Sequence, residues 1–199
     1  MVTSYIGGPP LDLSEVMNTV DGTLIAAGGF YAMNALMERY PDVQEYAKVA
    51  LNQKAEKLFE KLRTQCIADS ILTAGFVKSE TLTTDGKSFY DHTKRKNAVN
   101  RRLTEQLRTA LRKPSVPALV IANPFDDIVG SPQMKSSADT WCRKGGKIKF
   151  VRYIFEGRRA GNGLSHMVPA LRATDYAIDY MVDGFNGTLP TTCTVSVAN

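Results

Sequence analysis

The first part of the chain carries hydrophobic side chains at helical spacing. Residues 42–62 place apolar residues about every 3.6 positions, with Lys, Gln and Glu on the opposite face. This pattern predicts an amphipathic helix with one buried stripe. Asp42 and Glu45 form a capping-box-like start for it. The polar segment that follows, residues 73–92, is expected to be a loop.

A second helical repeat ends the first part of the chain. Apolar residues recur at spacing four near residues 95–112, and Pro114 follows them. We expect one amphipathic helix there, ended by the proline. Together these segments predict a helical, cap-like insertion over residues 12–113.

After this insertion the hydrophobic pattern becomes one of continuous runs. Residues 116–123 are almost entirely apolar, which is typical of a strand buried on both faces of a parallel sheet. Residues 147–155 predict a second strand, and residues 2–7 a short strand ended by Gly-Gly-Pro-Pro. Helices are expected over residues 131–146 and 166–187. The order from residue 116 onward is a βαβα unit, which predicts an α/β fold class with a short parallel sheet.

Composition limits the class of protein. Hydrophobic residues make up 43% of 199 residues and charged residues 23%, so we expect one soluble globular domain over residues 1–199, with the βαβα catalytic unit at 114–199. No apolar run reaches the roughly 20 residues that span a bilayer, and the start of the chain does not resemble a secretory signal. Three cysteines, an odd count, favour a reduced, cytoplasmic protein.

The net charge of +5 is mild, and one segment is locally basic. Residues 94–113 hold eight basic residues and one acid. They form either a solvated helix face or a docking patch for an acidic partner. The segment has no interleaved aromatic residues and no nucleic-acid motif, so we expect no nucleic acid. The two histidines have no metal-ligand spacing, and there is no phosphate loop or dinucleotide fingerprint, so no metal and no cofactor is expected.

Candidate chemistry lies where two predicted strands end. Asp126 and Asp127 follow one strand, and His166 follows the next. Functional residues of open α/β sheets collect beyond the carboxyl ends of strands. A histidine exchanges protons near neutral pH, and a carboxylate can fix its tautomer and stabilise the imidazolium. Taken separately, Asp126 could be a helix N-cap and His166 a loop histidine. Together they match the second half of the Ser…Asp…His order of α/β-hydrolases.

Several segments carry a specific resemblance. The stretches IGGPPLDLSEVMNTVDG, FDDIVGSPQ, WCRKGGKIKFVRY and DGFNGTLPTTC resemble the C-terminal half of the fungal secretory lipases, the family of the Candida-type lipase A. The resemblance implies a partial α/β-hydrolase fold, with Asp126 as triad acid and His166 as base. It places Asp127 in the neighbouring, non-triad position. It also implies a disulfide between Cys142 and Cys193.

The same resemblance leaves Cys66 free, because the family's partner cysteine lies in the N-terminal half. One family feature is missing from the chain. No Gly-x-Ser-x-Gly motif is present, and Ser165, next to His166, cannot easily point at the imidazole.

An initiating Met favours a complete short protein over a fragment. A sheet with so few strands would leave an edge bare, so we expect a homodimer.

Three hypotheses for function follow. The first is an enzyme in which the Asp126–His166 dyad acts as general base without a serine, closing a lactone or pyrone ring on a polyketide-type substrate. Its partners would be a hydrophobic small molecule and an acyl carrier domain or polyketide synthase docked on residues 94–113. Arg158 and Arg159 would hold a carboxylate or phosphopantetheine, and Phe30 and Tyr31 would line a pocket.

The second hypothesis is a lipase or esterase whose serine is supplied elsewhere, or by an unusual residue such as Ser165 or Ser131. The third is a hydrolase relic that binds a hydrophobic ligand in its cap without catalysis. His92 lies in a polar stretch, and we expect it to be solvated.

Overall fold

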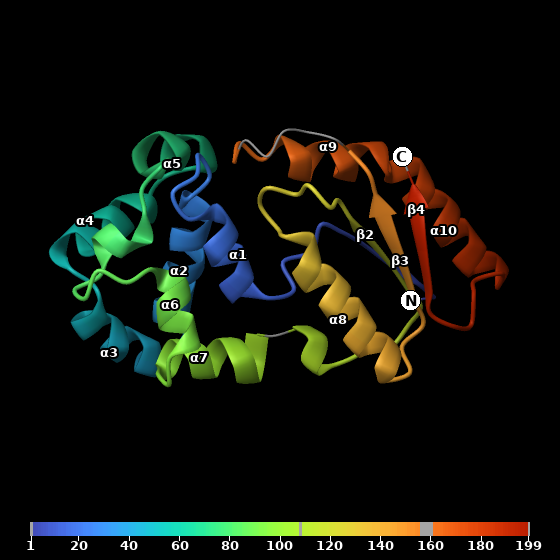
Figure 1. Ribbon diagram of the computed structural model, residues 1–199, viewed down its shortest axis with the longest axis horizontal. Helices are drawn as coiled ribbons and strands as arrows, with labels where there is room; N and C mark the ends of the chain where they lie inside the picture. Colours follow the sequence, from blue (N-terminus) through green and yellow to red (C-terminus); the bar gives the residue numbers. More distant parts are fainter. Residues whose placement is uncertain (1, 108, 156–160, 199) are drawn as a thin grey trace. The chain divides into compact units, whose positions relative to one another are not determined.

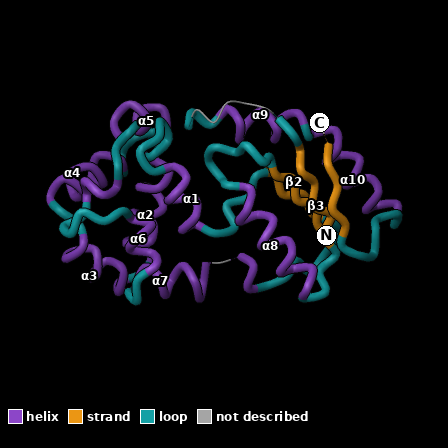
Figure 2. The backbone as a smooth tube through the Cα atoms, viewed as in Figure 1, coloured by secondary structure: helices purple, strands orange, loops and turns teal. Residues whose placement is uncertain are grey.

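The computed structural model describes residues 2–107, 109–155 and 161–198. It divides the chain into two compact units. The sheet unit comprises Met1–Leu11 and Thr109–Asn199, and the helical unit comprises Asp12–Arg108. Figure 1 and Figure 2 show strands in the sheet unit only.

The sheet unit is built on four parallel strands in the order β1-β2-β3-β4. Their bounds are β1 (Ser4–Gly7), β2 (Ala118–Ala122), β3 (Ile148–Tyr153) and β4 (Thr194–Ala198). Every residue of β2 is buried, as the continuous apolar run predicts. Because all four strands run in the same direction, their carboxyl ends lie along one edge of the sheet.

The sequence pattern predicted three strands and missed β4. Its apolar side chains alternate with polar ones, and Val195 and Val197 are exposed. An edge strand covered on one face only lacks the continuous apolar run that reveals a buried strand. Thr194 lies opposite Lys149 in the register of β3 and β4.

Helices cover both faces of the sheet. The helical elements of the sheet unit are η3 (Thr109–Leu111), α8 (Ser131–Arg143), α9 (Leu164–Arg172) and α10 (Thr174–Asn186). Ala173, Ala177 and Tyr180 pack on Leu119, Ile121 and Val151. Helix α8 contacts β2 and β3 and lies on the face opposite α10 (Figure 1). The single helix expected over residues 166–187 is thus two helices, which meet at Ala173.

A disulfide joins Cys142 in the last turn of α8 to Cys193, the residue before β4. The two cysteines are 51 positions apart, so the bond closes a long loop. Closure of such a loop stabilises a folded chain by about 2–4 kcal/mol, chiefly by restricting the unfolded state. Cys66 is exposed and unpaired. Both observations agree with what the family resemblance implies.

The helical unit packs its helices around one aromatic core. Its elements are α1 (Leu13–Val20), α2 (Ala27–Arg39), α3 (Pro41–Ala50), α4 (Gln53–Leu62), α5 (Ile67–Ala74), η1 (Ser79–Leu82), α6 (Phe89–Lys94), α7 (Ala98–Arg102) and η2 (Leu103–Leu107). The rings of Phe30, Phe59 and Phe89 contact one another at its centre. No helix among the described residues is both long and apolar enough to cross a membrane.

Local hydrogen bonds break the helices that periodicity predicted as continuous. The repeat over residues 42–62 forms α3 and α4, because Asn52 accepts hydrogen bonds from the N–H groups of Lys54 and Ala55 and starts a new helix. Asp42 is not an N-cap. Helix α3 starts instead at Pro41.

The polar segment at residues 73–92 is not a plain loop. It contains η1 and the start of α6, and a capping box of Ser88 and Asp91 begins the latter. The helix expected near residues 95–112 is divided among α7, η2 and η3. Asn97 starts α7 by accepting a hydrogen bond from Asn100 N–H.

Candidate active site

The candidate site lies where the first three strands of the sheet end. Gly8 follows β1, Asp126 and Asp127 follow β2, and His166 lies in the first turn of α9, after the loop that leaves β3. The parallel sheet therefore brings together side chains that are up to 158 positions apart in the chain. This is the edge at which open α/β sheets hold functional residues.

His166 and Asp126 are directly hydrogen-bonded. Nδ1 of His166 lies 2.8 Å from Oδ2 of Asp126. The other carboxylate oxygen, Oδ1, accepts hydrogen bonds from the N–H groups of Ile128 (2.9 Å) and Val129 (2.7 Å). The acid is thus fixed by its own turn, and its side chain is only 2% exposed. A fixed carboxylate sets both the orientation and the tautomer of the imidazole.

The imidazole of His166 has one free nitrogen. Because Nδ1 donates its proton to Asp126, the neutral ring carries its lone pair on Nε2. Nε2 has no hydrogen-bond partner among the described residues, and 24% of the side chain is exposed. An imidazole held in this way can accept a proton at Nε2 from a bound hydroxyl group.

Electrostatics favour the protonated form of His166. The hydrogen bond to Asp126 raises the pKa of the imidazole above its ordinary value, and the charges of Asp126 and Asp127 act in the same direction. Partial burial opposes this rise in pKa without cancelling it. A raised pKa makes the ring a stronger base, although a higher pH is then needed to free Nε2.

Gly8 lies against the imidazole, a contact that the sequence did not reveal. A Cβ atom at this position would lie 2.7 Å from Cε1 and 3.1 Å from Nδ1 of His166. The φ angle of Gly8 is +52°, a region that favours glycine. The only sequence signal was the Gly-Gly-Pro-Pro turn, which marks a strand end without indicating its neighbour.

Asp127 holds the backbone that leads to His166. Its Oδ2 accepts hydrogen bonds from the N–H groups of Asn162 (3.0 Å) and Gly163 (2.9 Å). Gly163 precedes α9 with a φ angle of +84°. The two adjacent acids therefore have different roles. Asp126 bonds to the imidazole of His166, and Asp127 bonds to the backbone of the turn before α9.

The serines named as candidate nucleophiles do not bond to the imidazole. Ser165 is fully buried, and its Oγ has no hydrogen-bond partner in the described part of the chain. Ser131 begins α8. No hydrogen bond joins either hydroxyl to His166 among the described residues.

The remaining candidate residues lie elsewhere. Phe30 is a core residue of the helical unit, only 2% exposed. Tyr31 hydrogen-bonds to Ser70 Oγ and to the carbonyl of Gln65, so its hydroxyl is engaged in structure. Arg158 and Arg159 lie outside the residues that the structure describes.

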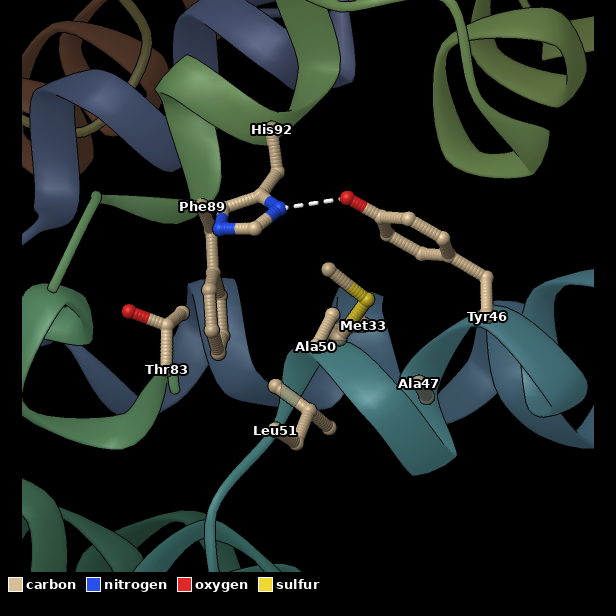
Figure 3. Close-up of a pocket in the computed structure, with 8 residues that line it drawn as sticks. All are labelled: Met33, Tyr46, Ala47, Ala50, Leu51, Thr83, Phe89 and His92. Carbon is tan, nitrogen blue, oxygen red and sulfur yellow. Dashed lines mark hydrogen bonds between the residues drawn. The ribbon is translucent and has the colours of Figure 1, made fainter. Parts of the chain in front are cut away.

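His92 is buried, contrary to the expectation of a solvated residue. It lines a small, mostly apolar pocket of the helical unit with Met33, Tyr46, Ala47, Ala50, Leu51, Thr83 and Phe89 (Figure 3). Both ring nitrogens are engaged, Nδ1 with Tyr46 Oη (2.6 Å) and Nε2 with Asp85 Oδ1 (3.1 Å). The pocket has room for about one water molecule. Unlike His166, His92 has no free nitrogen with which to accept a proton.

Half of the eight basic residues in the segment at residues 94–113 pair with carboxylates in the described part of the chain. Four of its side chains are ion-paired inside the helical unit: Lys94 with Glu15, Arg95 with Asp85, and Arg101 and Arg102 with Asp42. The sequence shows one acidic residue within this segment. The fold places three more beside it from other segments: Glu15, Asp42 and Asp85. The described residues contain no group of three His, Cys, Asp or Glu side chains that could hold a metal ion.

Comparison with known proteins identifies the family. The sequence model of the family described as secretory lipase matches residues 1–192. The chain belongs to the secretory lipase family. It is 25% identical over 186 residues to the secreted triacylglycerol lipase LIP1 of Malassezia furfur, and 26% identical over 168 residues to lipase 10 of Candida albicans. These matches cover 91% and 80% of this chain.

Solved structures show the same fold. Two structures of Candida antarctica lipase A, one of them in its closed state, superpose with TM-scores of 0.79 and 0.76 at 17% identity. They cover 98% and 95% of this chain, respectively. The expected partial α/β-hydrolase fold is thereby confirmed. The chain spans 36% of the Malassezia furfur lipase, 35% of the Candida albicans lipase, and 43–45% of the solved chains.

The expectation of a cytoplasmic protein is wrong. The family is secretory, and the similar Malassezia proteins are named secreted lipases. The odd cysteine count misled the sequence argument, since two of the three cysteines form a disulfide. Disulfides persist in oxidising compartments, which agrees with the secretory family.

Proposed function

We propose that the chain carries the acid–base pair of a lipase-like ester hydrolase. His166 is the general base and Asp126 is the residue that orients it. The observation that carries this proposal is the 2.8 Å hydrogen bond from Nδ1 to Asp126, which leaves Nε2 free. The family membership supports ester hydrolysis as the reaction.

The reaction would proceed through two proton transfers at Nε2. The free nitrogen takes the proton of an attacking hydroxyl group, whose oxygen forms a bond to the ester carbonyl carbon. The imidazolium, stabilised by Asp126, then gives that proton to the leaving alkoxide as the ester bond breaks. With water as the attacking group, hydrolysis is then complete. With a serine, an acyl-serine remains, and a water molecule that gives its proton to the same Nε2 cleaves it, the proton returning to the serine oxygen. The substrate would be an ester of a hydrophobic acid, because similar proteins are named triacylglycerol lipases.

The attacking hydroxyl has two sources consistent with the site. No serine among the described residues is hydrogen-bonded to His166. The hydroxyl would therefore come from water or from a serine on polypeptide beyond this chain. Both sources need the same base, so the role of His166 does not depend on the choice.

The polyketide hypothesis has less support than ester hydrolysis. Its docking patch, the basic segment, has four basic side chains already paired with acids. Non-catalytic ligand binding also has less support, because it leaves the hydrogen bond between Asp126 and His166 without a role. The homodimer stays a prediction: β1 and β4 each have one neighbouring strand in the described sheet.

Hydrolysis of p-nitrophenyl butyrate and decanoate by the purified chain tests the proposal. His166→Ala should lower the rate about 10²- to 10⁴-fold, the usual contribution of a general base. His92→Gln is the matched control, because it removes the other histidine and should leave the rate near that of the unchanged chain. A measurable rate of ester hydrolysis that is equal with and without His166 would overturn the proposal.

A fluorophosphonate probe shows whether a serine of this chain supplies the hydroxyl. Mass spectrometry of the labelled chain should find no adduct on its own serines if the hydroxyl comes from elsewhere. An adduct on Ser165 or Ser131 would instead show a serine nucleophile within the chain.

A further inference from the structure

Helix α9 contains a proline, Pro169, three residues after His166. Pro169 has no N–H group, so it cannot donate the helical hydrogen bond to the carbonyl four residues earlier. That carbonyl belongs to Ser165, the residue next to His166. Ser165 is fully buried, and an unpaired buried carbonyl is costly.

A side chain from β2 supplies the missing donor. Nδ2 of Asn123 donates to the carbonyl oxygen of Ser165 at 2.7 Å. Asn123 directly follows β2 and is only 2% exposed. The hydrogen bond joins the end of the central strand to the first turn of α9.

The same amide also joins β2 to the chain leaving β3. Its Oδ1 accepts hydrogen bonds from the N–H groups of Phe125 (3.2 Å) and Phe155 (3.4 Å). Nδ2 is also within 3.4 Å of the carbonyl of Phe155. One buried side chain therefore ties together the backbone before Asp126, the loop after β3 and the backbone beside His166.

We propose that Asn123 is a positioning residue for the Asp126–His166 pair. Its amide takes the place of the N–H that Pro169 lacks, and so fixes the part of α9 from which His166 extends. This inference rests on the proposed function for its effect on catalysis, although its effect on the His166–Asp126 hydrogen bond can be measured separately. A displacement of about 1 Å at a catalytic group can cost about 10²-fold in rate.

The test combines Asn123→Ala with a compensating change. Asn123→Ala should lower kcat up to about 10²-fold with little change in KM, and should move the pKa of His166 back toward its ordinary value. Pro169→Ala in the same chain restores an N–H that can bond to Ser165. The double variant should recover most of the kcat and the raised pKa of His166.

The pKa is read by NMR from the imidazole resonances, which are simple to assign because the chain has two histidines. Asn52→Ala is the matched control, since Asn52 also makes several side-chain hydrogen bonds to backbone, but in the helical unit. It should lower stability and leave the titration of His166 unchanged.

An Asn123→Ala chain with the unchanged kcat and unchanged His166 titration would overturn the proposal, whatever its stability. A double variant that recovers stability, but recovers neither kcat nor the raised pKa of His166, would also overturn the proposal. If Asn123→Ala does not fold, Asn123→Ser replaces it, because it is neutral and its short side chain cannot make all of the hydrogen bonds of the asparagine amide. Loss of the titration shift in a chain whose ester hydrolysis does not depend on His166 would reject the proposed function and still support the positioning role.

Discussion

Replacing Asp126 with asparagine should lower ester hydrolysis by up to about 10⁴-fold while leaving the fold intact. The asparagine amide must place its oxygen toward the N–H groups of Ile128 and Val129, which now bond to Oδ1. Its NH₂ group then faces Nδ1 of His166 and donates to it. The imidazole proton would move to Nε2, and the ring would lose the lone pair that takes the proton.

The matched control for Asp126→Asn is Asp139→Asn. Asp139 lies on α8 of the same unit and pairs with Lys135 at the surface, so its change should leave the rate unaffected. The test measures the steady-state rate of each variant on p-nitrophenyl butyrate. Circular dichroism verifies that both variants fold. An Asp126→Asn chain that retains full activity would show that the carboxylate does not set the tautomer.

Gly8→Ala should lower the rate about 10²-fold by displacing the imidazole. The added Cβ would lie 2.7 Å from Cε1 of His166, closer than such atoms approach, and Gly8 is followed by a proline that limits backbone movement. The ring must therefore shift, which disturbs its hydrogen bond to Asp126. The rate and the NMR titration of His166 should change together.

Gly187→Ala separates this steric effect from backbone strain. Gly187 also has a positive φ angle, +73°, but no atom lies within 4 Å of a Cβ there. Both variants should lose about 1–2 kcal/mol of stability from the strained backbone. Only Gly8→Ala should lose activity, and equal activities in the two variants would show that the contact with the imidazole is unimportant.

Much of the sheet could be predicted from sequence, because buried parallel strands have a continuous apolar pattern. β2 and β3 follow that pattern, whereas β4, covered on one face, does not. Helix boundaries were less predictable. Side-chain caps such as Asn52 and Ser88 decide where these helices begin, and such caps act through geometry that periodicity does not contain.

The proximity of Asp126 and His166 was also predictable, since one follows β2 and the other follows β3 beyond a loop, in the expected order. The residues that hold this acid and base in position could not be predicted. Gly8 and Asn123 contact residues more than 40 positions away, His166 and Ser165, and no local motif indicates either contact. Cellular location was misjudged because cysteine count was used without knowledge of which cysteines lie close together.

The most direct test of the account compares two titrations of the same chain. The rate of ester hydrolysis should rise with pH as the His166 imidazolium loses its proton, because the neutral ring is the active form. Since Asp126 raises the pKa of His166, the midpoint should lie above the ordinary value of about 6.5. The account predicts that the kinetic midpoint coincides with the midpoint of the His166 resonances in NMR. A rate whose midpoint differs from that of His166, or that persists in His166→Ala, would contradict it.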